Sequence, residues 1–105
     1  MNWLASPQTD DDLIAARDFI GADNERSARD FLDAAFETFN LLAQFPQMGP
    51  LAKFSDPTLK GMRYFVLPPP FGRWLIFYQL HAERIDIRRV LYGNINWKRE
   101  PERFF

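Results

Sequence analysis

The stretch that decides the fold is KGMRYFVLPPPFGRWLIFYQLHAERIDIRRVLYG, which runs from Lys60 to Gly93. It contains runs rich in aromatic and β-branched residues at 62–67, 73–80 and 84–92, a composition typical of β-strands. The prolines that follow the first run cannot donate hydrogen bonds to a sheet, so they end that strand. The second run is apolar on both faces, which predicts a central strand.

The third run contains a break in its alternation. Ile85 and Ile87 would share one face of a regular strand, whereas Val90 and Tyr92 would lie on the opposite face. One extra residue in the strand, at 88–89, would bring all four apolar side chains to the same side. The sequence therefore predicts a β-bulge at this point.

Two helical segments precede the strands. Ser6 followed by Pro7 is a helix start, and Gly21 is a plausible end of that helix. Asn24 is a cap residue for a second helix, in which apolar residues recur every three or four positions until Phe45-Pro46 ends it. Because the turn between them is very short, we expect an antiparallel helical hairpin with one shared apolar face.

The remaining segments are short. Residues 1–5 could add a small edge strand, 47–60 is predicted to be a surface loop, and the aromatic and basic segment 94–105 is expected to be a tail or a last helical turn that packs on the sheet. The sequence predicts a single domain over residues 1–105. Its expected fold class is α+β, with an N-terminal antiparallel helical hairpin packed on a small, mainly antiparallel β-sheet.

Composition narrows the function classes. The chain has a net charge of −1 and lacks the basic excess usual in nucleic-acid binders. It contains no cysteine, which excludes disulfides, thiol catalysis and thiolate metal sites. Residues 1–12 lack the basic and apolar regions of a signal peptide, and no apolar stretch approaches the roughly 18 residues of a membrane span. We expect a soluble, cytoplasmic protein that has no metal, no cofactor and no contact with a membrane.

Few residues offer conventional site chemistry. His81 stands alone in a predicted turn and is expected to be solvated, and the acidic run Asp10-Asp11-Asp12 is explained by the dipole of a helix start. Arginines, in contrast, lie on or next to each of the three predicted strands between residues 62 and 92. They are Arg63, Arg73, Arg84, Arg88 and Arg89. Two interpretations are open: solvated or internally paired side chains, or a basic surface on an open sheet face that receives carboxylates or phosphates.

The order of these segments resembles the RelE/ParE superfamily of bacterial type II toxins. The similarity runs from about Ser6 to Asn96 and is carried by a helix with DL, a turn with DN, a second helix ending in LLAQFPQMG, then KGMRYFVL, FGRWLIFY and IDIRRVLYG. It implies the same α+β fold. It also implies a toxin that is neutralised by an antitoxin encoded beside it.

The superfamily divides by target. RelE-like members cleave messenger RNA on the ribosome without a metal, whereas ParE-like members poison DNA gyrase. RelE-like enzymes carry an arginine about two residues after the glycine of RVLYG, where this chain has Ile95. An isoleucine cannot stabilise the charge of a phosphorane-like transition state. The resemblance therefore favours the ParE-like branch, linked to plasmid stabilisation, with no catalytic residues and no direct contact with nucleic acid.

Two alternatives remain open at this stage: a RelE-like messenger RNA endoribonuclease, and a non-toxic relative that only binds its antitoxin. For the ParE-like interpretation we expect a partner-binding surface for the antitoxin, formed by the helical hairpin and the exposed sheet. The C-terminal segment is expected to contribute to the surface for DNA gyrase. The residues predicted for partner binding are Arg63, Arg73, Arg88, Arg89, Tyr92 and Trp97.

Overall fold

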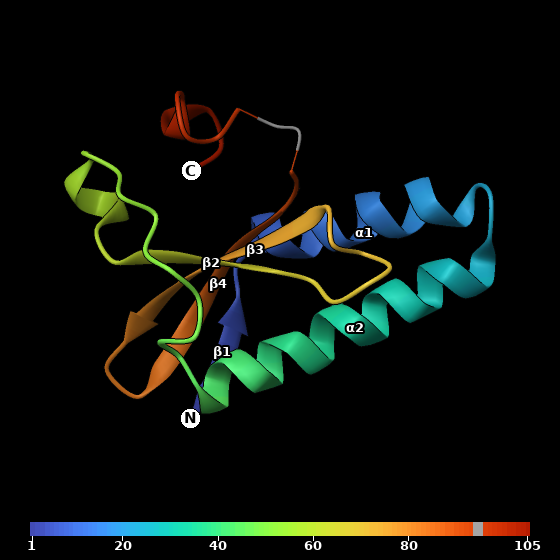
Figure 1. Ribbon diagram of the computed structural model, residues 1–105, viewed down its shortest axis with the longest axis horizontal. Helices are drawn as coiled ribbons and strands as arrows, with labels where there is room; N and C mark the ends of the chain where they lie inside the picture. Colours follow the sequence, from blue (N-terminus) through green and yellow to red (C-terminus); the bar gives the residue numbers. More distant parts are fainter. Residues whose placement is uncertain (94–95) are drawn as a thin grey trace.

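The computed structural model describes residues 1–93 and 96–105, and it shows two long helices beside a four-stranded sheet (Figure 1). A short 3₁₀ turn, η1, precedes the second strand, and another, η2, lies in the C-terminal segment. The elements are β1 (Asn2–Ala5), α1 (Pro7–Gly21), α2 (Glu25–Gln44), η1 (Pro57–Leu59), β2 (Met62–Val66), β3 (Trp74–His81), β4 (Arg84–Tyr92) and η2 (Pro101–Arg103). The predicted α+β class is confirmed.

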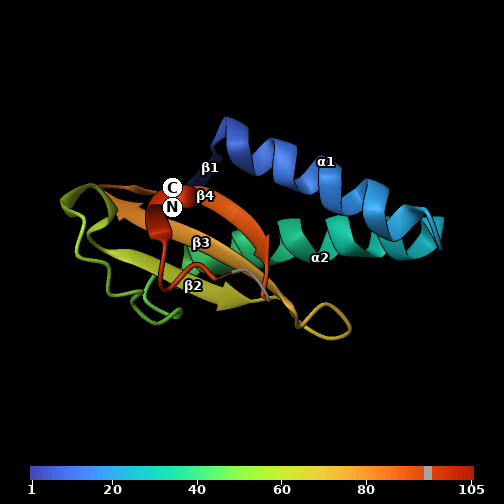
Figure 2. The ribbon, with the colours of Figure 1, turned by 90° about the horizontal axis from the view of Figure 1, so that it is seen from above.

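Both helices begin at the predicted caps. The Ser6 side chain accepts a hydrogen bond from the Thr9 amide at 3.1 Å, and the Asn24 side chain accepts one from the Ser27 amide at 3.0 Å. These contacts satisfy amides that have no partner within the helix itself. The first helix ends at Gly21, as predicted, and the two helices form an antiparallel hairpin along one side of the sheet (Figure 2).

The strand order is β1-β4-β3-β2, with β1 parallel to β4 and the other pairs antiparallel. The predicted edge strand and the predicted central strand, β3, are therefore both confirmed. Phe77 pairs with Arg89 and Tyr78 pairs with Ile87, so Arg88 is the extra residue of a bulge. This bulge lets Ile87 and Val90 face the helices together, as the broken alternation indicated.

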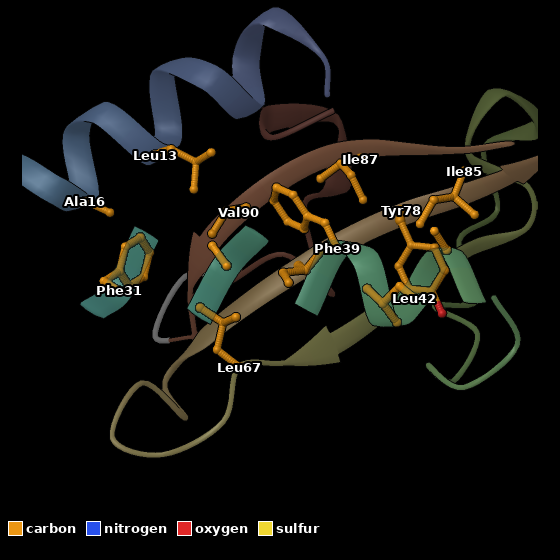
Figure 3. Close-up of a cluster of buried hydrophobic side chains, with 13 residues drawn as sticks. Leu13, Ala16, Phe31, Phe39, Leu42, Leu67, Tyr78, Ile85, Ile87 and Val90 are labelled. Atoms are coloured by element: carbon orange, nitrogen blue, oxygen red, sulfur yellow. The ribbon is translucent and has the colours of Figure 1, made fainter. Parts of the chain in front are cut away.

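The main core lies between the sheet and the helical hairpin (Figure 3). Apolar side chains from both helices meet side chains from β3 and β4 there. They include Leu13, Ala16, Phe31, Phe39, Leu42, Leu67, Ile76, Tyr78, Ile85, Ile87 and Val90. Aromatic rings meet edge-to-face in this layer. The ring centroids of Phe31 and Trp74, for example, are 5.1 Å apart with their planes at 63°.

The opposite face of the sheet is also covered, in part by the C-terminal segment, which was expected to be a tail or a helical turn that packs on the sheet. Phe77, at the centre of this second face, is fully buried under Trp97 and Phe105, whose ring centroids lie 4.9 and 5.1 Å away. Leu59 of the preceding loop is buried in the same cluster. The expectation of an open sheet face is therefore wrong at its centre, and the segment 47–60 is only in part a surface loop.

No helix in the described ranges is long and apolar enough to cross a membrane.

Candidate partner-binding site

Arg63 lies on the face of the sheet that carries the helices, below the turn that follows α2. Its Nη1 atom donates hydrogen bonds to the carbonyl oxygens of Gly49, at 2.7 Å, and Gln47, at 3.4 Å. The Tyr78 hydroxyl holds the same turn, donating to the Pro46 carbonyl at 2.8 Å and accepting from the Gly49 amide at 3.0 Å. Arg63 is half-buried, and the contacts found here hold the loop in place.

Arg89 is the centre of a polar cluster at the second face of the sheet. Its Nε and Nη2 atoms each donate to the Asp12 carboxylate at 2.8 Å, and the same carboxylate accepts the Val90 amide at 2.9 Å. A third guanidinium contact, at 2.6 Å, reaches the Phe104 carbonyl. The hydrogen bonds that Arg89 donates to the Asp12 carboxylate raise the pKa of Arg89, while partial burial opposes that rise. Arg89 therefore joins α1, β4 and the C-terminal segment.

Arg88, the extra residue of the bulge, is oriented by a different partner. Its Nη1 atom donates to Oε1 of Gln79, a side chain that is 8% exposed. The amide nitrogen of Gln79 donates in turn to the carbonyl oxygens of Lys60, at 3.1 Å, and Thr58, at 3.4 Å. The bulge arginine is thereby connected to the loop before β2.

Arg73 and Tyr92 lie together at the other end of the sheet. They line an open cavity of about 400 Å³ with Gly72 and Gly93, and Arg73 is exposed. Tyr92 is half-buried, with its ring 5.1 Å from that of Trp74. In the part of the chain that the structure describes, no ion pair or hydrogen bond holds the Arg73 side chain.

The last predicted residue, Trp97, is 6% exposed and forms part of the apolar cover over Phe77. The structure therefore brings only pairs of the predicted residues together: Arg73 with Tyr92, and Arg88 with Arg89. Arg63 lies apart from both pairs because it faces the helices, whereas Trp97 lies on the second face, as Arg89 does. Their role in partner binding stays a prediction, as does the argument from Ile95, which lies outside the described residues.

The side chains that are most common in metal and acid–base sites do not converge. His81 is exposed, and its Nε2 atom lies 3.3 Å from the Asp86 carboxylate, which also pairs with Arg84 at 2.9 Å. Over residues 1–93 and 96–105, no group of three or more histidine, cysteine or acidic side chains could hold a metal ion. Asp12, the third residue of the acidic run, is tied to Arg89 and does more than complement a helix dipole.

Comparison with known proteins decides the family. The family model of the ParE toxin of the type II toxin–antitoxin system parDE matches residues 4–97. The chain belongs to the ParE toxin family. A solved structure, described as the chromosomal ParDE TA system from P. aeruginosa, is 18% identical and has a TM-score of 0.69, with 88% of this chain and 95% of that chain covered. A search of curated protein sequences gave no match.

The helical hairpin, which was expected to form part of the antitoxin surface, carries a groove whose lining residues were not predicted from the sequence. The groove between α1 and α2 is lined by Asp10, Leu13, Ile14, Arg17, Leu32 and Phe36, and the Phe36 ring stacks on that of Trp3 in β1 with the centroids 6.0 Å apart. Ile14 and Phe36 are 48% and 41% exposed. Both are apolar residues off the stripe that faces the sheet, and that misplacement is the signal that could have revealed the groove.

Proposed function

We propose that this ParE-family toxin inhibits DNA gyrase and is neutralised by an antitoxin that covers the groove between its helices. Family membership supports the toxin class. The observation that supports DNA gyrase over messenger RNA as the target is that most of the basic side chains near the sheet are engaged within the chain. Arg63, Arg88 and Arg89 all donate to groups within the chain itself. Catalysis of RNA cleavage would instead need cations converging on an exposed phosphate.

The groove between the helices supports an antitoxin of a particular chemistry. Its apolar floor, from Ile14, Leu32 and Phe36, suits the apolar stripe of an amphipathic helix. Arg17 and Arg29 line the adjoining cavity, which has a volume of about 510 Å³, together with the acidic side chains of Asp18 and Glu25. Within the described residues Arg17 pairs with exposed Asp18, a contact of little strength in water. An amphipathic segment would therefore meet apolar anchors flanked by charges of both signs.

The antitoxin proposal is tested on the complex of the toxin with the product of the neighbouring open reading frame. Ile14→Asp puts a carboxylate into the groove and is expected to weaken antitoxin binding by at least about tenfold, the loss of one apolar anchor. The matched control is Phe19→Asp, since Phe19 is on the same helix, is 73% exposed and does not line the groove. Equal affinities for both variants and the wild type would contradict the groove assignment.

Exposed Arg73, which directly precedes β3 and lies beside Tyr92, has its own test in the same binding assay. Arg73→Glu reverses the charge of a side chain that the described structure leaves exposed. If antitoxin affinity stays unchanged, Arg73 is not part of that contact. If toxicity falls while antitoxin affinity is kept, Arg73 and Tyr92 belong to the surface for the target.

The target is tested by induction of the toxin without its antitoxin and by supercoiling assays with purified DNA gyrase. We expect inhibited supercoiling, DNA damage linked to gyrase, and intact messages in primer extension. Cleavage of messages within codons would support the RelE-like alternative instead. Normal growth on induction would leave only the non-toxic relative that binds an antitoxin.

A further inference from the structure

The end of α2 and the turn that follows it form a surface without charge. Residues 38–52, TFNLLAQFPQMGPLA, contain no charged side chain, although 26% of the whole chain is charged. Of the eleven large hydrophobic residues that are exposed in the described part of the chain, four lie in this segment, so exposed apolar surface is concentrated here. They are Leu41, Phe45, Met48 and Leu51, with exposed fractions between 38% and 58%, and we call this group the uncharged patch.

Three members of the patch follow one another at the end of the helix. Leu41 and Phe45 are one helical turn apart, and the Phe45 amide donates to the Leu41 carbonyl at 2.9 Å. The Met48 amide donates to the Phe45 carbonyl at 3.0 Å, a hydrogen bond that closes a four-residue turn and keeps these two residues close. The three side chains therefore leave the backbone within one short, compact segment.

The fourth member, Leu51, lies on the same side of the sheet as this turn. It forms an antiparallel bridge with Arg63, and the side chains of such a pair point to the same face. Arg63 faces the helices and donates to the carbonyl oxygens of Gln47 and Gly49 in the turn itself. Figure 1 shows this loop, in green, running from the end of α2 to η1. The uncharged patch thus spans the end of α2 and the outer side of β2.

The backbone beneath the patch is fixed before any partner arrives. The Tyr78 hydroxyl and the Arg63 guanidinium hold the turn through its backbone groups. A partner would therefore meet apolar side chains on an ordered backbone, which lowers the entropic cost of association. None of the four patch residues lines the groove between the helices, so this surface is distinct from the one proposed for the antitoxin.

An uncharged apolar surface suits a second copy of the same chain. In a two-fold contact a patch meets itself, so any charge within it would lie near an equal charge of the other copy. This patch has none, and its exposed amides, Gln44 and Gln47, can each donate and accept hydrogen bonds and so pair with their own equivalents. The net charge of −1 adds little repulsion between two approaching copies.

The area of the patch is sufficient for such a contact. The four apolar side chains expose roughly 400 Å² per copy, within the range of the largest and often functional patches of monomeric proteins. With exposed Gln44, Gln47 and Pro50 included, two copies would bury about 1,200 Å² in total, where specific interfaces begin. From these observations we infer that the uncharged patch is the contact of a two-fold homodimer of this toxin.

The test is sedimentation velocity of the intact purified toxin between about 1 and 200 µM. An interface at the lower limit of area gives an expected dissociation constant of about 1–100 µM. Phe45→Asp puts a carboxylate into the patch of both copies and is expected to raise this constant at least about tenfold. Phe19→Asp is the matched control, since Phe19 is an exposed phenylalanine outside the patch, and it is expected to dimerise as the wild type does.

The absence of cysteine from the sequence permits a second measurement. A single cysteine, introduced by Phe45→Cys or by Met48→Cys, is the only thiol of the chain and reacts with a short bismaleimide. Both variants are expected to form a covalent dimer, whereas Phe19→Cys at the same concentration stays monomeric. Because these exposed positions tolerate small side chains, circular dichroism of each variant is expected to match that of the wild type.

Four results would overturn the inference. The first is a wild-type chain that sediments as a monomer up to about 200 µM. The second is a dissociation constant that Phe45→Asp leaves unchanged or that Phe19→Asp raises equally. The third is cross-linking of Phe19→Cys as efficient as that of the patch variants. The fourth is a monomeric wild type combined with a loss of antitoxin affinity in Phe45→Asp, which would assign the patch to the antitoxin instead.

Discussion

Replacing Tyr78 with phenylalanine removes one oxygen atom from the centre of the molecule. Tyr78 is fully buried, and its hydroxyl is the common partner of the Pro46 carbonyl and the Gly49 amide. The variant would leave the Gly49 amide buried without this acceptor, at a cost of about 1–3 kcal/mol. It would also remove the hydrogen bond to the half-buried Pro46 carbonyl, at a cost of about 1 kcal/mol. The expected loss is about 2–4 kcal/mol, or roughly 10–20 °C in melting temperature.

The measurement is urea unfolding followed by circular dichroism. Tyr64→Phe is the matched control, since Tyr64 lies on the neighbouring strand and its hydroxyl forms no hydrogen bond within the described ranges. We expect the control to differ from the wild type by less than about 0.5 kcal/mol. If both variants lost the same stability, the hydroxyl of Tyr78 would not hold the turn and the reasoning would fail.

The same hydroxyl gives a pH dependence with a definite sign. Burial raises the pKa of Tyr78 above its usual value of 10.0, an effect that the Gly49 hydrogen bond and the charge of Arg63 oppose. The folded chain therefore keeps this proton at a pH where the unfolded chain has lost it, so the contribution is complete below about pH 10 and is lost as the pH rises further. The stability difference between the wild type and Tyr78→Phe should shrink above about pH 10.

Other contacts lead to independent predictions. Asp12→Ala leaves the half-buried Arg89 guanidinium without its carboxylate and should lower the free energy of unfolding by about 2–4 kcal/mol, measured by urea unfolding. Gly49→Ala places a Cβ atom 2.5 Å from a backbone oxygen of β2 and should reduce stability by more than about 2 kcal/mol, whereas Gly72→Ala, with no neighbour closer than 3.9 Å, should change it little. Deleting 104–105 uncovers the second-face cluster and should increase binding of the dye ANS while lowering the melting temperature; unchanged dye binding would show that these residues do not cover it.

Much of the fold could be predicted from local patterns. The caps at Ser6 and Asn24, and the bulge at Arg88, all leave a signal within a few residues of themselves. Hydrophobic periodicity similarly identified the stripes of both helices that face the sheet. Such features depend on short-range geometry, so one sequence is sufficient to reveal them.

Fewer of the contacts in the candidate site could be predicted from the sequence. The pairing of Asp12 with Arg89 joins residues 77 positions apart, and no periodic pattern indicates which acidic side chain an arginine will meet. The cover over Phe77 depends on the path of the C-terminal segment, which carries too few residues for a pattern. Arginines that looked like one surface in the sequence were therefore distributed by the topology over both faces of the sheet and its ends.

The parallel pairing of β1 with β4 has a consequence for how the toxin folds during its synthesis. Asn2 pairs with Arg84, so the strand made first must wait for a partner translated roughly 4–16 s later at usual rates of synthesis. Until then the apolar face of α2 lacks the β4 side chains that bury it in the finished sheet. The sheet of this toxin therefore cannot be complete until β4 has been translated.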